Sequence, residues 1–141
     1  MKSLKDQLLK AKPPQPREVW KVQDLEVRLH SENREDKKVR PVLVVSSDKL
    51  TVPNASIINV VPLTTSKNPD SLIIPIGKAY EETAKGFSLK EASCALLQFY
   101  QPIELKYFVE RCGTIEENTY CAIQFTLCSE LIGYVDFDLT L

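Results

Sequence analysis

The sequence lacks the residue patterns of a metal-binding protein. Its four cysteines form no CxxC pair, and His30 is the only histidine that could complete a ligand set. Structural zinc sites use Cys and His at short, fixed spacings, so we expect no metal and no other cofactor. The cysteines are instead expected to be buried free thiols, with Cys94 in an apolar strand and Cys121 and Cys128 seven residues apart in a helix.

An excess of charge of either sign is also missing. The chain carries 18 Lys and Arg against 19 Asp and Glu, for a net charge of −1 at pH 7. Nucleic-acid binders normally contact phosphates through an excess of Lys and Arg, so any nucleic-acid site must be a local patch. We find no signal peptide, no long apolar run and no internal repeat. These absences predict a protein of the reducing cytoplasm without membrane contact.

Two apolar, β-branched runs dominate what is present, one over residues 39–47 and one over 57–65. Each has the length of a strand and is bounded by polar residues, so both are expected to be strands buried on two sides. If they pair antiparallel, Arg40 at the start of the first lies beside Thr64 at the end of the second. A cation and a hydroxyl would then share one rim of the sheet.

The N-terminal segment is expected to be a short helix followed by a stiff connector. Leucines fall on one side of a helix over residues 2–12, and three prolines within 13–16 then forbid helix. A half-buried strand follows over 17–22, with Trp20 in the core. The polar segment 23–38 is either a solvated loop or a functional flap, and composition alone favours the loop.

The C-terminal half supplies edge and helix signals. Pro75 cannot donate to a ladder, which places the strand over 72–76 at an edge or at a bulge. Thr114 and Glu117 form a capping-box pattern, so a helix with an apolar core face should begin there and end near Ile132. The remaining expected elements are strands over 92–100 and 108–113 and a tail over 134–141 that is either a strand or loose chain.

Short strands with one terminal helix predict a mainly β fold with some α, a small and partly open SH3-like barrel. A chain of 141 residues can bury roughly 68% of its unfolded surface, enough for a core without disulfides. We therefore expect a single domain over residues 1–141. It divides into an extra N-terminal helix and Pro-rich connector over 1–16 and a barrel with a C-terminal helix over 17–141.

Several motifs occur in an order that is similar to one toxin family. Arg-Pro-Val-Leu-Val-Val begins at Arg40, Val-Pro-Leu-Thr-Thr begins at Val61, and Arg-Glu-Val-Trp begins at Arg17. Together they resemble the MazF/PemK (Kid) toxins of type II toxin–antitoxin systems, from residue 17 to near Ile132. The resemblance implies a CcdB/Kid/MazF-type fold and a sequence-specific endoribonuclease.

The resemblance also implies which residues cleave RNA. Without a metal, the 2′-hydroxyl attacks phosphorus and leaves a 2′,3′-cyclic phosphate. The site must therefore help to deprotonate the 2′-hydroxyl, stabilise charge on the phosphoryl oxygens and protonate the leaving 5′-oxygen. Arg40 offers a planar fork of donors to the phosphate, Thr64 adds a hydroxyl hydrogen bond, and Glu32, within a Ser-Glu-Asn that looks like the family's Ser-Glu-Gln, is the expected base. Only one of Thr64 and Thr65 can face this site, because neighbours on a strand point to opposite faces. The expected RNA-binding residues are Lys37, Lys38, Thr65, Ser66 and Lys67.

Partners follow from the same resemblance: single-stranded RNA in a groove across a homodimer, a cognate antitoxin on the same surface, and DNA contact only through that antitoxin. Two alternatives remain open. One is an inactive SH3-like binding or regulatory module, in which Arg40 is only a surface salt-bridge partner; the charged spacer 34–38 and the extra helix favour it. The other is a CcdB-type gyrase poison, which uses a tryptophan near the C-terminus, whereas the single tryptophan here is Trp20.

Overall fold

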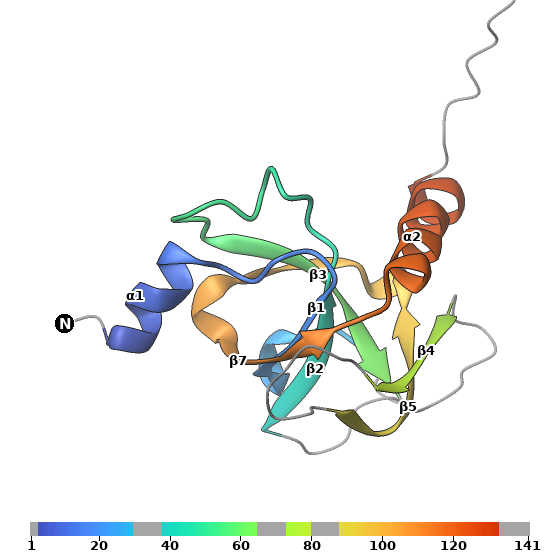
Figure 1. Cartoon of the computed structure of the whole chain (residues 1–141), viewed down its shortest axis with the longest axis horizontal. Helices are drawn as coiled ribbons and strands as arrows, with labels where there is room; N and C mark the ends of the chain where they lie inside the picture. The colour runs from blue at the N-terminus through green and yellow to red at the C-terminus, as the bar shows by residue number, and fades with distance from the viewer. Residues whose placement is uncertain (1–2, 30–37, 65–72, 80–87, 133–141) are drawn as a thin grey trace, which may run out of the picture.

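The computed structural model describes residues 3–29, 38–64, 73–79 and 88–132 (Figure 1). Within these ranges, seven strands form one sheet, and an α-helix lies near each end of the chain. The strands are β1 (Glu18–Gln23), β2 (Val39–Val44), β3 (Ile57–Thr64), β4 (Ile73–Ala79), β5 (Ser88–Leu96), β6 (Gln101–Glu104) and β7 (Phe108–Thr114). The helices are α1 (Leu4–Ala11) and α2 (Glu117–Thr126), with short 3₁₀ turns η1 (Asp24–Glu26), η3 (Leu97–Phe99) and η4 (Leu105–Tyr107) and a π-helical turn η5 (Leu127–Ile132).

The two apolar runs are strands, as predicted, and they pair antiparallel as neighbours in the sheet. Strand β2 pairs with β3 in a register that places Val42 opposite Pro62 and Val44 opposite Val60. The full strand order is β4-β5-β3-β2-β1-β7, with β6 also paired to β3. Strand β3 changes neighbours along its length, pairing with β6 and β2 first and with β5 at Leu63 and Thr64.

This change of partner turns the sheet on itself, and Figure 1 shows β4 and β5 standing apart from β1, β2 and β7. The predicted small, partly open antiparallel barrel with a C-terminal helix is confirmed. Pro75 was expected at an edge or a bulge, and both hold: β4 is the terminal strand, and its register with β5 shifts just after Pro75.

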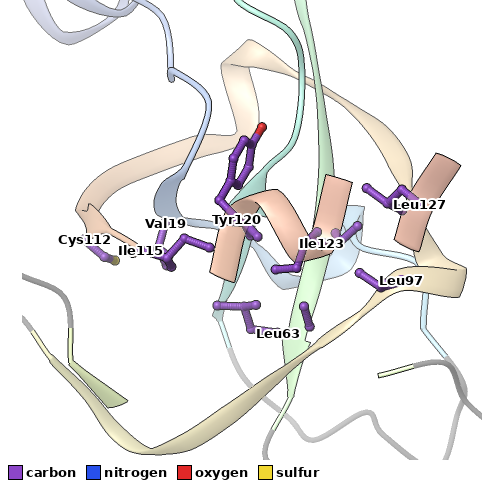
Figure 2. Close-up of a cluster of buried hydrophobic side chains, with 11 residues drawn as sticks. Val19, Leu63, Leu97, Cys112, Ile115, Tyr120, Ile123 and Leu127 are labelled. Atoms are coloured by element: carbon purple, nitrogen blue, oxygen red, sulfur yellow. The ribbon is translucent and has the colours of Figure 1, made fainter. Parts of the chain in front are cut away.

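Alternation along the strands separates two buried clusters. Leu63 and Val61 face helix α2, whereas Val60 and Ile58 face the opposite side of the sheet. Figure 2 shows the first cluster, in which Tyr120, Ile123 and Leu127 lie over Leu63 and Leu97. We call it the α2 core; it comprises Val19, Leu43, Val61, Leu63, Ala95, Leu97, Cys112, Ile115, Tyr120, Ile123 and Leu127. The second core comprises Leu9, Trp20, Val22, Val27, Val42, Val44, Ile58, Val60, Ile103, Leu105 and Phe108.

Helix α2 begins later than the capping-box pattern predicts, so that detail is wrong. Thr114 is the last residue of β7, and its hydroxyl accepts a hydrogen bond from Arg111 Nη2 at 2.7 Å. The N-cap is Glu116, whose side chain makes no capping bond. The predicted end is right, because η5 continues the helical chain to Ile132.

Two other predictions need correction. Strand β5 ends at Leu96 and not at residue 100, and residues 101–104 form the separate strand β6. Cys121 and Cys128 are exposed, because they lie on the part of the helix turned away from Tyr120 and Ile123; Cys94 and Cys112 are buried as expected. Gly133 and the tail 134–141 lie outside the described residues.

Helix α1 packs on the second core through one leucine. Leu9 is buried, whereas Leu4 and Leu8 are 70% and 61% exposed. Ser3 caps its first turn by accepting a hydrogen bond from Asp6 N, and Asn54 N donates to Lys10 O at 2.8 Å. Trp20 is also in this core, as predicted. Its ring meets that of Phe108 edge-on, with 6.0 Å between the two ring centroids.

No described helix has both the length and the apolar character that a membrane span requires.

Candidate active site at the rim of the barrel

A buried ion pair lies at the rim where β1 ends and β2 begins. Arg40 Nε donates to Asp24 Oδ1 at 2.8 Å, and the two side chains are only 4% and 5% exposed. A buried charge is costly unless it is paired and hydrogen-bonded, so each residue makes the burial of the other tolerable. We call this contact the Asp24–Arg40 pair.

The β1–β2 ladder determines that these two residues meet. Gln23 pairs with Val39 and Val22 with Arg40, and the backbone N of Asp24 donates to Lys38 O at 3.1 Å, one step further along. Asp24 and Arg40 are therefore diagonal neighbours on one face of the sheet, a separation that long side chains span. The carbonyl of Asp24 accepts from Val27 N at 3.1 Å, which closes turn η1.

Gln101 holds the chain that leaves this turn. Its Nε2 donates to Arg28 O at 3.0 Å and to Phe99 O at 2.9 Å, and its Oε1 accepts from Arg28 N at 2.8 Å. The side chain of Gln101 is buried, so these bonds satisfy polar groups that would otherwise be costly. The turn that carries Asp24 is thus fixed by the ladder at one end and by β6 at the other.

Thr64 lies on the same face of the sheet as Arg40. It is the last residue of β3, it is 6% exposed, and it pairs with Cys94 of β5. Alternation along β3 puts Thr64 on the face of Ile58 and Val60, and alternation along β2 puts Arg40 on the face of Val42. The β2–β3 pairs end at Val42 and Pro62, and Arg40 and Thr64 each lie two residues beyond that pair on their own strands.

Of the other predicted site residues, only Lys38 lies among the described residues. Lys38 is exposed, and its carbonyl takes part in the ladder to Asp24. The expected base, Glu32, and the remaining expected RNA-binding residues lie outside the described residues: Lys37, Thr65, Ser66 and Lys67. Their roles remain predictions.

Sequence reasoning missed Asp24, which it counted among the charged residues of a solvated segment. A signal was present: Trp20 and Val22 alternate with polar residues, and Asp24 continues that alternation inward on the core side. The structure also revises the reading of Arg40 as a surface salt-bridge partner, because the pair is buried.

The arrangement can present an oriented guanidinium. Nε–H is one of five donors of an arginine side chain, so a carboxylate on Nε fixes the plane of the group, and the two terminal nitrogens carry the other four donors. A planar fork of this kind matches the oxygens of a phosphate. Among the residues described, no three His, Cys, Asp or Glu side chains cluster as metal ligands would.

The fold and this rim define a small antiparallel barrel with a terminal helix, in which Arg40 lies near the start of β2 and Thr64 at the end of β3. A family model assigns it more closely: the chain belongs to the PemK-like, MazF-like toxins of type II toxin–antitoxin systems, matched over residues 17–131. Helix α1 precedes the matched segment. No match was found among curated proteins.

Solved structures share the fold at low sequence identity. An endoribonuclease in complex with its cognate antitoxin from a mycobacterial species aligns with a TM-score of 0.58 and 13% identity, over 86% of this chain and 98% of that one. The Mycobacterium tuberculosis toxin MazF-mt6 gives 0.54 and 17%, over 79% and 92%. A further mycobacterial endoribonuclease gives 0.52 and 14%, over 81% and 86%. At these identities the likeness shows a common fold.

Proposed function

We propose that this protein is a metal-independent endoribonuclease toxin that cleaves single-stranded RNA at a short sequence and is neutralised by a cognate antitoxin. Membership of the toxin family supports this proposal, as does the fold shared with structures that are endoribonucleases. The proposal is carried by strand alternation, which assigns Arg40 and Thr64 to one face, each two residues beyond the last β2–β3 pair and each buried.

In this proposal the 2′-hydroxyl next to the scissile bond attacks phosphorus, the 5′-oxygen leaves, and a 2′,3′-cyclic phosphate remains. Arg40 stabilises the charge that develops on the phosphoryl oxygens, and Thr64 donates a further hydrogen bond to the same group. Glu32 takes the proton from the 2′-hydroxyl as the base, and the departing 5′-oxygen takes up a proton from water, so the second fragment ends in a 5′-hydroxyl. Because Arg40 and Thr64 are 3% and 6% exposed, RNA binding has to open this rim before the phosphate reaches them.

The remaining parts of the proposal concern binding. Lys37, Lys38 and Lys67 contact RNA phosphates, and Thr65 and Ser66 add hydrogen bonds. The protein acts in the cytoplasm as a homodimer with RNA in a groove across the interface. The antitoxin competes for that surface and provides any contact with DNA.

The test is cleavage of a long, mixed-sequence single-stranded RNA in EDTA by purified protein freed of antitoxin. We expect cuts at one short recurring sequence, lost in Arg40→Ala and in Thr64→Ala. Arg111→Ala is the matched control, since it removes an arginine that is also ion-paired, with Glu18, elsewhere on the sheet. Thr126→Ala is the control for the hydroxyl, because its Oγ1 donates only to the carbonyl of Ala122 within α2. Both controls should cut normally; loss of cutting in the controls, or its survival in the site variants, would refute the assignment.

A second candidate is a binding or regulatory module of the same fold without catalysis. The Asp24–Arg40 pair favours it, because a buried carboxylate that neutralises Arg40 is also what a purely structural arginine would have. The same assay separates the two functions. A folded, antitoxin-free wild-type protein that leaves RNA intact would support the binding module.

A further inference from the structure

We propose that Asp24 is a positioning residue of the RNA-cleaving site, which orients the guanidinium of Arg40 toward the scissile phosphate. This inference rests on the proposed function. It starts from the 2.8 Å bond between Arg40 Nε and Asp24 Oδ1, in which both side chains are almost fully buried.

The geometry of that bond suits orientation. An arginine side chain rotates about several bonds, and its guanidinium can face many directions unless one of its donors is held. Asp24 binds the Nε–H edge, which fixes the plane and directs the terminal nitrogens away from Asp24.

The backbone of Asp24 is held by two hydrogen bonds within the described residues. Its N–H continues the β1–β2 ladder to Lys38 O, and its carbonyl closes η1 with Val27 N. Gln101 then fixes Arg28 on β6 with bonds of 2.8 and 3.0 Å. Strand register and a short turn therefore fix the backbone of Asp24, so that its Oδ1 can hold the guanidinium of Arg40 in one orientation.

Two substitutions separate orientation from charge. Asp24→Asn keeps an oxygen that can accept from Nε but removes the negative charge, whereas Asp24→Ala removes both. A misplacement of a catalytic group by about 1 Å can cost roughly 100-fold in rate. We expect cleavage at saturating RNA to fall about 10- to 100-fold in Asp24→Ala and less in Asp24→Asn.

RNA affinity gives a readout that loss of structure would not produce. With the neutralising carboxylate gone, Arg40 attracts the phosphate more strongly, so Asp24→Asn should bind RNA several-fold more tightly while cleaving it more slowly. Partial unfolding would weaken binding and cleavage together. Affinity is measured with an RNA that contains the mapped cleavage sequence and a 2′-deoxy nucleotide at the cut, which can bind but cannot react.

The experiment compares wild type, Asp24→Asn, Asp24→Ala and the control Glu110→Gln, at a temperature at which circular dichroism shows all four folded. Glu110 carries an exposed carboxylate paired with Lys21 at 3.0 Å, so the control makes the same chemical change outside the site. Adding Asp24→Ala to Arg40→Ala should change the residual rate by less than about twofold, because Asp24 acts through Arg40.

Failure of the positioning role and failure of the proposed function give different results. If wild type cleaves RNA and both Asp24 variants cleave as fast, the positioning role is wrong and the proposed function stands. If Asp24→Asn loses affinity and rate in parallel, Asp24 is structural and the inference is overturned. If folded wild type cleaves no RNA, the proposed function fails and the inference fails with it. If Asp24 orients Arg40, the Nε–H of Arg40 should give a slowly exchanging signal in the ¹H–¹⁵N spectrum of the wild type. We expect this signal to be lost in Asp24→Ala and kept in Glu110→Gln.

Discussion

Removal of Asp24 should destabilise the fold far more than removal of the whole pair. Asp24→Ala removes the carboxylate that pairs with the guanidinium of Arg40, whose side chain is 4% exposed in the native structure. Breaking a buried pair from one side costs about 3–5 kcal/mol, whereas replacing both members with apolar groups is often close to neutral. We therefore expect Asp24→Ala to lose about 3–5 kcal/mol of unfolding free energy, and Asp24→Ala/Arg40→Met to recover about 2 kcal/mol or more of that loss.

The assay is urea unfolding followed by the fluorescence of Trp20, the single tryptophan, which is buried in the second core beside Phe108. A domain of this size has a total stability of about 5–15 kcal/mol, so the loss should move the midpoint clearly. Lys21→Ala, which breaks the partly exposed pair with Glu110, is the control and should cost about 1 kcal/mol or less. A loss below about 1 kcal/mol in Asp24→Ala, or no recovery in the double variant, would refute the reasoning from burial.

Three further outcomes follow from the α2 core. Ile123→Ala should lower the unfolding free energy by about 2–5 kcal/mol in urea, because the side chain is 0% exposed between α2 and the sheet; a loss under 1 kcal/mol would contradict this packing. Tyr120→Phe should be neutral or stabilising by up to about 1 kcal/mol, because the buried hydroxyl has no hydrogen-bond partner among the described residues; a clear loss would show that the hydroxyl is satisfied. Burial raises the pKa of Cys112 from 9.0 to about 11. The thiol of the unfolded chain loses its proton at lower pH than that of the folded protein, so the stabilisation should be full below pH 9 and be lost as the pH rises toward 11. The melting temperature should therefore fall less steeply with pH in Cys112→Ala than in the wild type, and an equal fall in both proteins would contradict the raised pKa.

The central architecture was predictable because it depends on local composition. Two β-branched runs bounded by polar residues have few alternatives to buried strands. Their antiparallel pairing was only a condition of the sequence reading, and the structure shows it. Pro75 likewise restricts its strand through the missing N–H, wherever the strand lies. In both cases the residue types themselves determine the local structure, whatever the rest of the chain does.

Asp24 was not predictable in the same way, because its burial depends on a partner 16 residues away. In the sequence it is one acid among many charges, and only the β1–β2 register brings it to Arg40. The prediction that Thr114 caps helix α2 was wrong for a related reason. Its spacing to Glu117 fits a capping box, but β7 extends to Thr114 in the pairing with β1. Tertiary pairing overrides a local signal of about 1 kcal/mol.

The chemical groups at the ends of the cut RNA distinguish attack by the 2′-hydroxyl from metal-dependent hydrolysis. RNA cut by wild-type protein in EDTA is analysed by mass spectrometry of the fragments. The account predicts a 2′,3′-cyclic phosphate on one side of the cut and a 5′-hydroxyl on the other, produced by wild type and absent in Arg40→Ala. Fragments with 3′-hydroxyl and 5′-phosphate ends, or cleavage that EDTA abolishes, would contradict it.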